Sequence, residues 1–203
     1  MPTLQSLFGE IDIYLFDQLL RGRIAVGARI FDAGCGSGRN LVYLLREGFE
    51  VFGVDSDPRA IEAVRSLSES LAPGLPAGNF RAEAVEATSF PDAFADVAIS
   101  SAVLHFARDE DHFDAMLGGL WRILRPGGLF FCRLASTIGI ERQVRRISGR
   151  RFVLPDHSER YLVDEPILME HTTRLGGRLL DPLKTTVVSN QRSMTTWVMR
   201  KQG

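Results

Sequence analysis

Two acidic residues stand beside a cluster of glycines in the first third of the chain. Asp32 directly precedes the run Ala33-Gly34-Cys35-Gly36-Ser37-Gly38, and Asp55 ends the next short apolar run. A strand that ends in glycines brings bare backbone N–H groups close to a ligand. A carboxylate beside such a turn would repel a pyrophosphate and attract an ammonium group. The pattern therefore favours a ligand with a positive amine, and Asp55 is placed to accept the hydroxyls of a ribose.

The glycine spacing argues against a dinucleotide site. The chain reads G-x-G-x-G, and Arg39 stands where the G-x-G-x-x-G pattern requires its third glycine. A nicotinamide-dependent oxidoreductase is thus the weaker alternative. A ligand that combines an amino-acid end with a ribose is S-adenosylmethionine.

Three segments together resemble the class I S-adenosylmethionine-dependent methyltransferase family. They are Ile30–Gly38, Phe90–Ser100 and Leu120–Leu129, and the resemblance covers about residues 30–135. The chain is also similar to small bacterial enzymes of the tellurite-resistance type in its length, its opening helix and its segment Ser89-Phe90-Pro91-Asp92. One departure is the alanine in Phe94-Ala95-Asp96, because family members commonly place Phe directly before this Asp. The resemblance implies S-adenosylmethionine as cofactor and methyl transfer as the reaction.

The resemblance also assigns roles to residues. Gly34 and Gly36 are expected along the methionine portion, with Asp32 holding its amine directly or through water, and Asp55 on the ribose. Asp57 either flanks the adenine with Ser56 or caps a helix. The adenine edge is expected to meet Glu83 and the following Ala84 or, as a second choice, Glu86. The full predicted cofactor-binding set is Asp32, Gly34, Cys35, Gly36, Gly38, Asp55, Ser56, Glu83, Ala84, Ser100 and Tyr14.

His105 is the candidate catalytic residue. It follows the predicted fourth strand, near the expected methyl donor, where an imidazole with a pKa near neutrality could act as a general base. The alternative is a histidine that only packs or caps the loop. Tyr14 could similarly be a lid over the cofactor or an ordinary core residue of the opening helix. Because the sulfonium is already activated, methyl transfer needs alignment more than a dedicated acid or base.

The elements that must position these residues alternate between short apolar runs and helical stretches, which predicts a doubly wound α/β fold. We expect a mostly parallel, seven-stranded sheet with an antiparallel terminal strand. Parallel strands are expected at 29–33, 50–54, 80–85, 96–100 and 129–134, and an antiparallel pair at 185–189 and 194–199. Helices are expected at 11–21, 40–47, 58–71, 112–124 and 164–175. Residues 1–203 are expected to form a single domain, with a cofactor half at about 25–135 and an acceptor-side insert at about 136–163.

Composition restricts the partners. The formal net charge is −1 and 45% of the residues are hydrophobic, so no global field attracts nucleic acid or an anionic membrane. The two cysteines, Cys35 and Cys132, have no metal-ligand spacing, and no metal is expected. The sequence shows no signal peptide and no apolar run of about 20 residues, which favours a cytoplasmic protein.

The acceptor is expected to be a small molecule, because no Asn/Asp-Pro-Pro-aromatic motif for nucleic-acid or protein amino groups occurs. The oligomeric state stays open. An arginine cluster in the insert either recognises an anion or forms a solvated face, and the second alternative is favoured. Its members are Arg142, Arg145, Arg146, Arg150 and Arg151. A protein that binds the cofactor without catalysis of its own is a further alternative.

Overall fold

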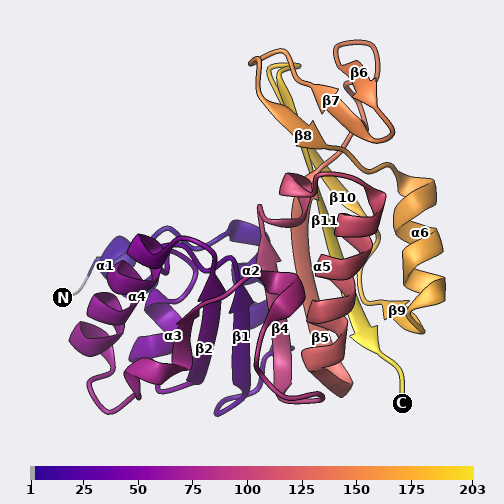
Figure 1. The fold of residues 1–203 in the computed structure, drawn as a ribbon. Helices are drawn as coiled ribbons and strands as arrows, with labels where there is room; N and C mark the ends of the chain where they lie inside the picture. The colour runs from indigo at the N-terminus through magenta and orange to yellow at the C-terminus, as the bar shows by residue number, and fades with distance from the viewer. Residues whose placement is uncertain (1–2) are drawn as a thin grey trace.

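A computed structural model describes residues 3–203 of the chain, and a twisted sheet runs through its centre (Figure 1). Five parallel strands lie in the order β3-β2-β1-β4-β5, and β11 joins β5 in the antiparallel sense. Strand β10 extends the sheet beyond β11, and the short strand β9 also pairs with β11. The strand bounds are β1 Arg29–Ala33, β2 Glu50–Asp55, β3 Phe80–Ala82, β4 Ala95–Ser101, β5 Leu124–Ala135, β9 Gly177–Leu179, β10 Lys184–Val188 and β11 Arg192–Lys201. The expected doubly wound fold with an antiparallel strand is confirmed.

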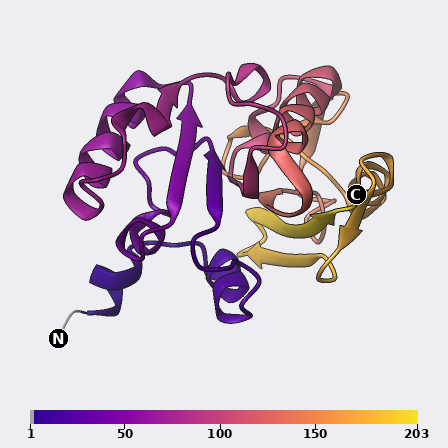
Figure 2. The same ribbon diagram turned by 90° about the horizontal axis from the view of Figure 1, so that it is seen from below.

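Helices cover both faces of this sheet (Figure 2). Neighbouring strand residues point to opposite faces, so Ile30 packs in one buried cluster and Phe31 in the other. The first cluster includes residues of α2, α3 and α4, and the second includes residues of α5 and α6. The helix bounds are α1 Leu4–Phe8, α2 Ile13–Leu20, α3 Val42–Arg46, α4 Pro58–Leu71, α5 Glu110–Ile123 and α6 Glu165–Arg174. No helix within residues 3–203 is long and apolar enough to cross a membrane.

The helix ends follow local capping chemistry. Asp57 caps α4 by accepting the Arg59 N–H, and Asp164 caps α6 by accepting the Ile167 N–H. Helix α5 begins two residues before its expected start, because the carboxylate of Asp109 accepts the N–H of His112. The third strand is shorter than expected, because a 3₁₀ turn, η2 (Val85–Ala87), follows β3. Two further 3₁₀ turns are η1 (Ala77–Asn79) and η3 (Leu104–Phe106).

A second, three-stranded antiparallel sheet lies in the expected insert. It consists of β6 (Arg145–Ser148), β7 (Arg151–Val153) and β8 (Glu159–Tyr161), and it stands above the main sheet in Figure 1, next to one end of the β10–β11 pair. The sequence analysis predicted an insert at about 136–163 but no strands within it. Its short, mostly exposed strands are held by pairing with one another, which local pattern does not reveal.

The arginine cluster of the insert is spread over this small sheet. Arg150 pairs with Asp164 at 2.6 Å, Arg151 pairs with Glu159 at 2.6 Å, and Arg146 stacks over the Phe152 ring. Arg142 and Arg145 are exposed to solvent. This arrangement agrees with a solvated face carrying local ion pairs.

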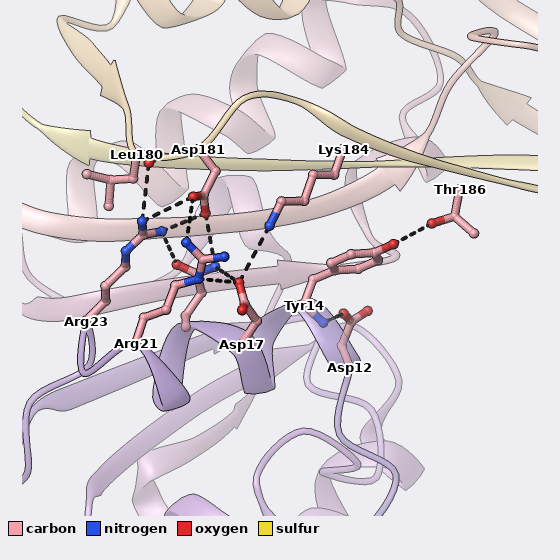
Figure 3. Close-up of polar contacts among 10 residues, drawn as sticks. Asp12, Tyr14, Asp17, Arg21, Arg23, Leu180, Asp181, Lys184 and Thr186 are labelled. Atoms are coloured by element: carbon pink, nitrogen blue, oxygen red, sulfur yellow. Dashed lines mark hydrogen bonds and ion pairs between the residues drawn. The ribbon is translucent and has the colours of Figure 1, made fainter.

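A buried carboxylate attaches α2 to the segment between β9 and β10 (Figure 3). Asp181 accepts two hydrogen bonds from the Arg23 guanidinium, at 2.6 and 3.1 Å, and one from Gln18 Nε2 at 3.2 Å. Arg21 lies 3.4 Å from the same carboxylate. This contact holds the carboxyl end of α2, and at the amino end the N-cap Asp12 accepts a hydrogen bond from Ser101 at the end of β4.

We expect Asp181→Asn to lower the free energy of unfolding at pH 7 by about 2 kcal/mol, the range for a hydrogen-bonded charged group. The hydrogen bond with Arg23 lowers the pKa of Asp181 in the folded chain. The ionised carboxylate therefore stabilises the fold above the unfolded pKa of about 4, and this contribution is lost as the pH falls through the lower folded pKa.

Urea unfolding at pH 7 and at acidic pH measures this difference, which should shrink in acid. The control is Asp17→Asn, which breaks a more exposed i,i+4 pair with Arg21 and should cost less than about 1 kcal/mol. Equal losses in the two variants would contradict the role given to Asp181.

Candidate active site

The largest cavity described here lies at the carboxyl ends of the parallel strands. The order β3-β2-β1-β4-β5 reverses direction between β1 and β4, and open α/β sheets bind ligands in the crevice at such a switch point. The cavity has a volume of about 610 Å³. Its lining residues follow β1, β2, β3 and β4 or lie at the start of α5: Gly34, Asp55, Ser56, Ala84, Val85, Glu86, Ala102, Val103, Phe106, Arg108, His112 and Met116.

The three glycines of the turn differ in what they face. All three have positive φ, and a Cβ on Gly34 would collide with the Val103 side chain at the cavity wall. A Cβ on Gly36 would meet no atom within 4 Å, so its backbone is open to a ligand. Gly38 is different, because a Cβ there would meet Val64 and Leu67 of α4 at 2.9 and 2.8 Å. The structure therefore gives Gly38 a packing role and does not place it at the cavity.

Asp55 is fixed at the cavity by backbone donors. One carboxylate oxygen accepts the Gly36 N–H and the other accepts the Asp57 N–H, both at 2.9 Å. Ser56 lines the same cavity, whereas Asp57 does not and caps α4 instead. The glycine turn and the end of β2 thus form one hydrogen-bonded unit, and the Asp55 side chain has a single defined position.

Asp32 lies beneath this turn at the end of β1. It is 2% exposed, and its Oδ2 atom has no hydrogen-bond partner in the described part of the chain. Burial raises the pKa of Asp32 to about 7, against the opposing effect of the nearby Arg39. A buried carboxylate oxygen without a donor is costly, so it fits a ligand that brings its own donor.

Five further residues of the predicted set are not among those that line the cavity: Asp32, Gly36, Cys35, Ser100 and Tyr14. The Cys35 side chain is buried against Gly53 of β2, and this burial raises its pKa. Ser100 is fully buried within β4, opposite Cys132 of β5. The hydroxyl of Tyr14 lies 2.7 Å from Thr186 Oγ1 of β10, so this side chain joins α2 to the sheet and does not cover the cofactor cavity (Figure 3).

The two candidate carboxylates for the adenine edge point in different directions. Glu83 accepts hydrogen bonds from the Ser89 N–H and hydroxyl at 2.8 and 2.6 Å and from the Thr88 hydroxyl at 3.1 Å. Burial acts to raise the pKa of Glu83, but these hydrogen bonds lower it. Glu86 lines the cavity together with Ala84, and Glu83 does not. Glu83 is used to close its own loop, so the structure brings Glu86 and not Glu83 to the cavity, whereas the adenine contact itself stays a prediction.

Helix α5 supplies lining residues that the sequence analysis missed. His112 Nε2 lies 3.1 Å from Glu86 Oε1, and the other ring nitrogen accepts the Arg108 N–H. Met116 lies one helical turn further along the same wall. Gly119 permits this approach, since a Cβ there would lie 2.6 Å from the Val85 carbonyl oxygen. The signal available in the sequence was the four-residue spacing of His112 and Met116, which follow the helix cap Asp109 and therefore lie on one face of the helix.

His105 lines a second, smaller cavity and not the first. This cavity of about 270 Å³ shares Ala102 with the larger one. His105 Nδ1 accepts the Ala135 N–H at 3.2 Å, and burial lowers the pKa of His105 to about 4, assisted by the charge of Arg160. The imidazole is therefore neutral near pH 7, with its proton on Nε2. The basic nitrogen Nδ1 is already occupied by the Ala135 N–H, and a pKa of about 4 makes it a weak base, so the structure disfavours the general base that the sequence suggested.

Within residues 3–203, no three His, Cys, Asp or Glu side chains come together as a set of metal ligands. The polar residues that line the cavity are Asp55, Ser56, Glu86, Arg108 and His112, of which Glu86 and His112 form a pair. This donor set suits an organic ligand that carries an amine, hydroxyls and a heterocycle.

Similar proteins share this arrangement of sequence and fold. The chain is 36% identical over 105 residues to the Ubiquinone biosynthesis O-methyltransferase of Methylocella silvestris, a match that covers 52% of this chain and 39% of that protein. It is 31% identical over 124 residues to the S-adenosyl-L-methionine-dependent Diels-Alderase of Talaromyces variabilis, covering 56% of this chain and 39% of that protein. The chain thus spans well under two thirds of the length of either relative.

A solved structure with the same fold is the 1,6-didemethyltoxoflavin-N1-methyltransferase of Burkholderia thailandensis, which has bound 1,6-didemethyltoxoflavin and S-adenosylhomocysteine. It superposes with a TM-score of 0.71 at 21% identity and covers 96% of this chain and 80% of its own. Residues 31–132 of the present chain match the family model described as Methyltransferase domain. Because that match runs from β1 into β5 and includes the elements that build the cavity, the chain belongs to the class I S-adenosylmethionine-dependent methyltransferase family.

Proposed function

We propose that this chain transfers a methyl group from S-adenosylmethionine to a small-molecule acceptor. The observation that carries the proposal is the buried, unpartnered Asp32 oxygen beneath a glycine turn, whose Gly34 lines the switch-point cavity of a methyltransferase-family sheet. An ammonium group would satisfy that oxygen, whereas a pyrophosphate would be repelled by it. The small-molecule acceptor is supported by the activity in the name of the Burkholderia thailandensis enzyme.

The cofactor, when bound, supplies a sulfonium that already activates the methyl group, so the protein has to bind, orient and exclude water. Asp32 holds the amine, and the open backbone of Gly36 lies along the methionine portion. Asp55, preset by two backbone N–H groups, accepts the ribose hydroxyls. Glu86 accepts from the adenine amine, and His112 keeps the Glu86 carboxylate in place.

A second candidate function is a reaction that uses the bound cofactor without consuming its methyl group. It is favoured by the Diels-Alderase of Talaromyces variabilis, which is named as S-adenosyl-L-methionine-dependent and is 31% identical to this chain. The single-domain organisation, the acceptor role of residues 136–163 and the cytoplasmic location stay predictions.

We expect the purified chain to transfer label from S-adenosyl-[methyl-³H]methionine to the small-molecule fraction of a cell extract. The smaller cavity beside the cofactor cavity has the size of a small molecule, so we expect the label in the small-molecule fraction and not in the protein or nucleic-acid fractions. Heat-treated protein is the control. Tight cofactor binding with no labelled product in any fraction would favour the second candidate.

We expect Asp32→Asn to weaken S-adenosylhomocysteine binding by about 1.5–3 kcal/mol, the range for a charged hydrogen bond. The pKa of Asp32 is near 7, and only its ionised form attracts the ammonium group. Affinity of the unchanged chain should therefore rise from pH 6 to pH 7, where the ligand amine stays protonated. The Asn variant should show no such rise.

Isothermal titration calorimetry at both pH values measures this dependence. Asp57→Asn is the matched control, because Asp57 neighbours the cavity but caps α4. A pH-independent affinity of the unchanged chain would contradict the assignment of Asp32.

The adenine contact proposed for Glu86 can be distinguished from one made by Glu83. If Glu86 accepts a hydrogen bond from the adenine amine, the chain should bind S-adenosylhomocysteine more tightly than S-inosylhomocysteine, which lacks that amine. Glu86→Ala should reduce this preference by about 1 kcal/mol. Glu83→Gln, which keeps acceptors for its own loop, should retain it. Loss of the preference in the Glu83 variant alone would reverse the assignment.

A further inference from the structure

The smaller cavity lies beside the cofactor cavity and is enclosed by three parts of the chain. Ala102, at the end of β4, lines both cavities. Its φ of 65° is unusual for a residue with a side chain, and its N–H donates to the Arg133 carbonyl at 2.8 Å, which fixes the turn between the two spaces. A molecule in the smaller cavity is therefore next to the ligand of the larger one.

The walls of this cavity combine apolar surface with a few polar groups. Ala135, Leu154 and Met194 supply the apolar part, and the small β6–β8 sheet closes one side. Its volume of about 270 Å³ is at the lower end of the range for small-molecule pockets. The space thus suits a compact, partly apolar molecule with one or two polar groups.

The two arginines of the cavity are in different electrostatic states. Arg192 is paired with Asp156 at 2.5 Å, and hydrogen bonds from Ser158 and then Arg192 lower the pKa of Asp156 to about 2. Its charge is therefore compensated. Arg160 forms no ion pair with any acid in residues 3–203, and one of its N–H groups donates to the Glu159 carbonyl.

The Arg160 guanidinium stacks over the Phe106 ring at 4.7 Å from the ring centre. This stacking holds the planar group at the border between the two cavities, because Phe106 itself lines the larger one. No Asp or Glu is among the residues that line the smaller cavity. His105 there is neutral and presents a donor at Nε2. The cavity therefore carries an uncompensated positive charge and a neutral donor.

We propose that the smaller cavity is the acceptor subsite and that it takes a compact, partly apolar acid, whose anionic oxygen group is bound by Arg160. This inference rests on the proposed function, because the acceptor must lie next to the cofactor. A guanidinium fork matches a carboxylate or phenolate in geometry as well as charge. Arg160 is thus a specificity-determining residue, and His105 Nε2–H is a second donor to the same acceptor.

The test uses benzoate and its neutral isostere benzamide as probes. Both are titrated by ligand-observed NMR into the full chain saturated with S-adenosylhomocysteine. Benzoate should bind about tenfold more tightly than benzamide, as expected for a charge-assisted hydrogen bond. Arg160→Gln should remove this preference and leave S-adenosylhomocysteine affinity unchanged within about twofold. Arg160→Lys should restore part of it.

Arg145→Gln is the matched control, because it removes the same charge from the exposed surface of the same insert and should change neither affinity. The inference is overturned by equal binding of the two probes, by no binding of benzoate, or by a preference that survives Arg160→Gln. In each of these cases the proposed function still stands if the chain binds S-adenosylhomocysteine. Failure of the unchanged chain to bind S-adenosylhomocysteine overturns both. The probe comparison on the unchanged chain decides the anion preference even if the Gln variant does not fold.

Discussion

A carboxylate buried without a complete set of partners is the constraint around which this structure is arranged. Asp32 ends the central strand β1, and the sheet and the glycine turn exclude solvent from its Oδ2 atom. Leaving such an atom without a donor costs free energy, and the cost is recovered only when a ligand supplies the missing donor. The same burial raises the pKa of Asp32 to about 7, so this carboxyl group is only partly ionised near neutral pH. A positively charged amine is then selected by both charge and hydrogen bonding.

The remaining parts of the cavity are positioned by contacts that carry no ligand chemistry themselves. Gly38 and Gly119 contact neighbouring elements so closely that a side chain would not fit. The contact of Gly38 places the glycine turn against α4, and the contact of Gly119 places η2 against α5. Asp181 anchors α2, so that Asp12 reaches Arg133 and Ser101 near the end of β4. The site therefore depends on packing on both faces of the sheet.

The two cavities draw on different parts of the chain. The larger cavity is built from the stretch that matches the family model. The smaller one draws on β8, on the start of β11 and on the loop between β7 and β8, which lie outside that stretch. Ala102 belongs to both, and it marks the place where a methyl group would pass from one ligand to the other.

The sequence by itself determined the sheet, the turn and the acids of the cofactor half. The apolar runs, Pro58 and the caps Asp57 and Asp164 are local signals, and their structural consequences lie within a few residues of them. Gly34, Asp55 and Ser56, which belong to the same local pattern, line the cavity. Tertiary structure alone decided which of Glu83 and Glu86 lines the cavity. The reason is that the Glu83 carboxylate accepts hydrogen bonds from Thr88 and Ser89, in a loop that folds back onto it. It likewise placed Tyr14 on β10 and His105 in the second cavity, since a side chain's direction depends on partners far away in the chain, and spacing along the sequence carries no record of them.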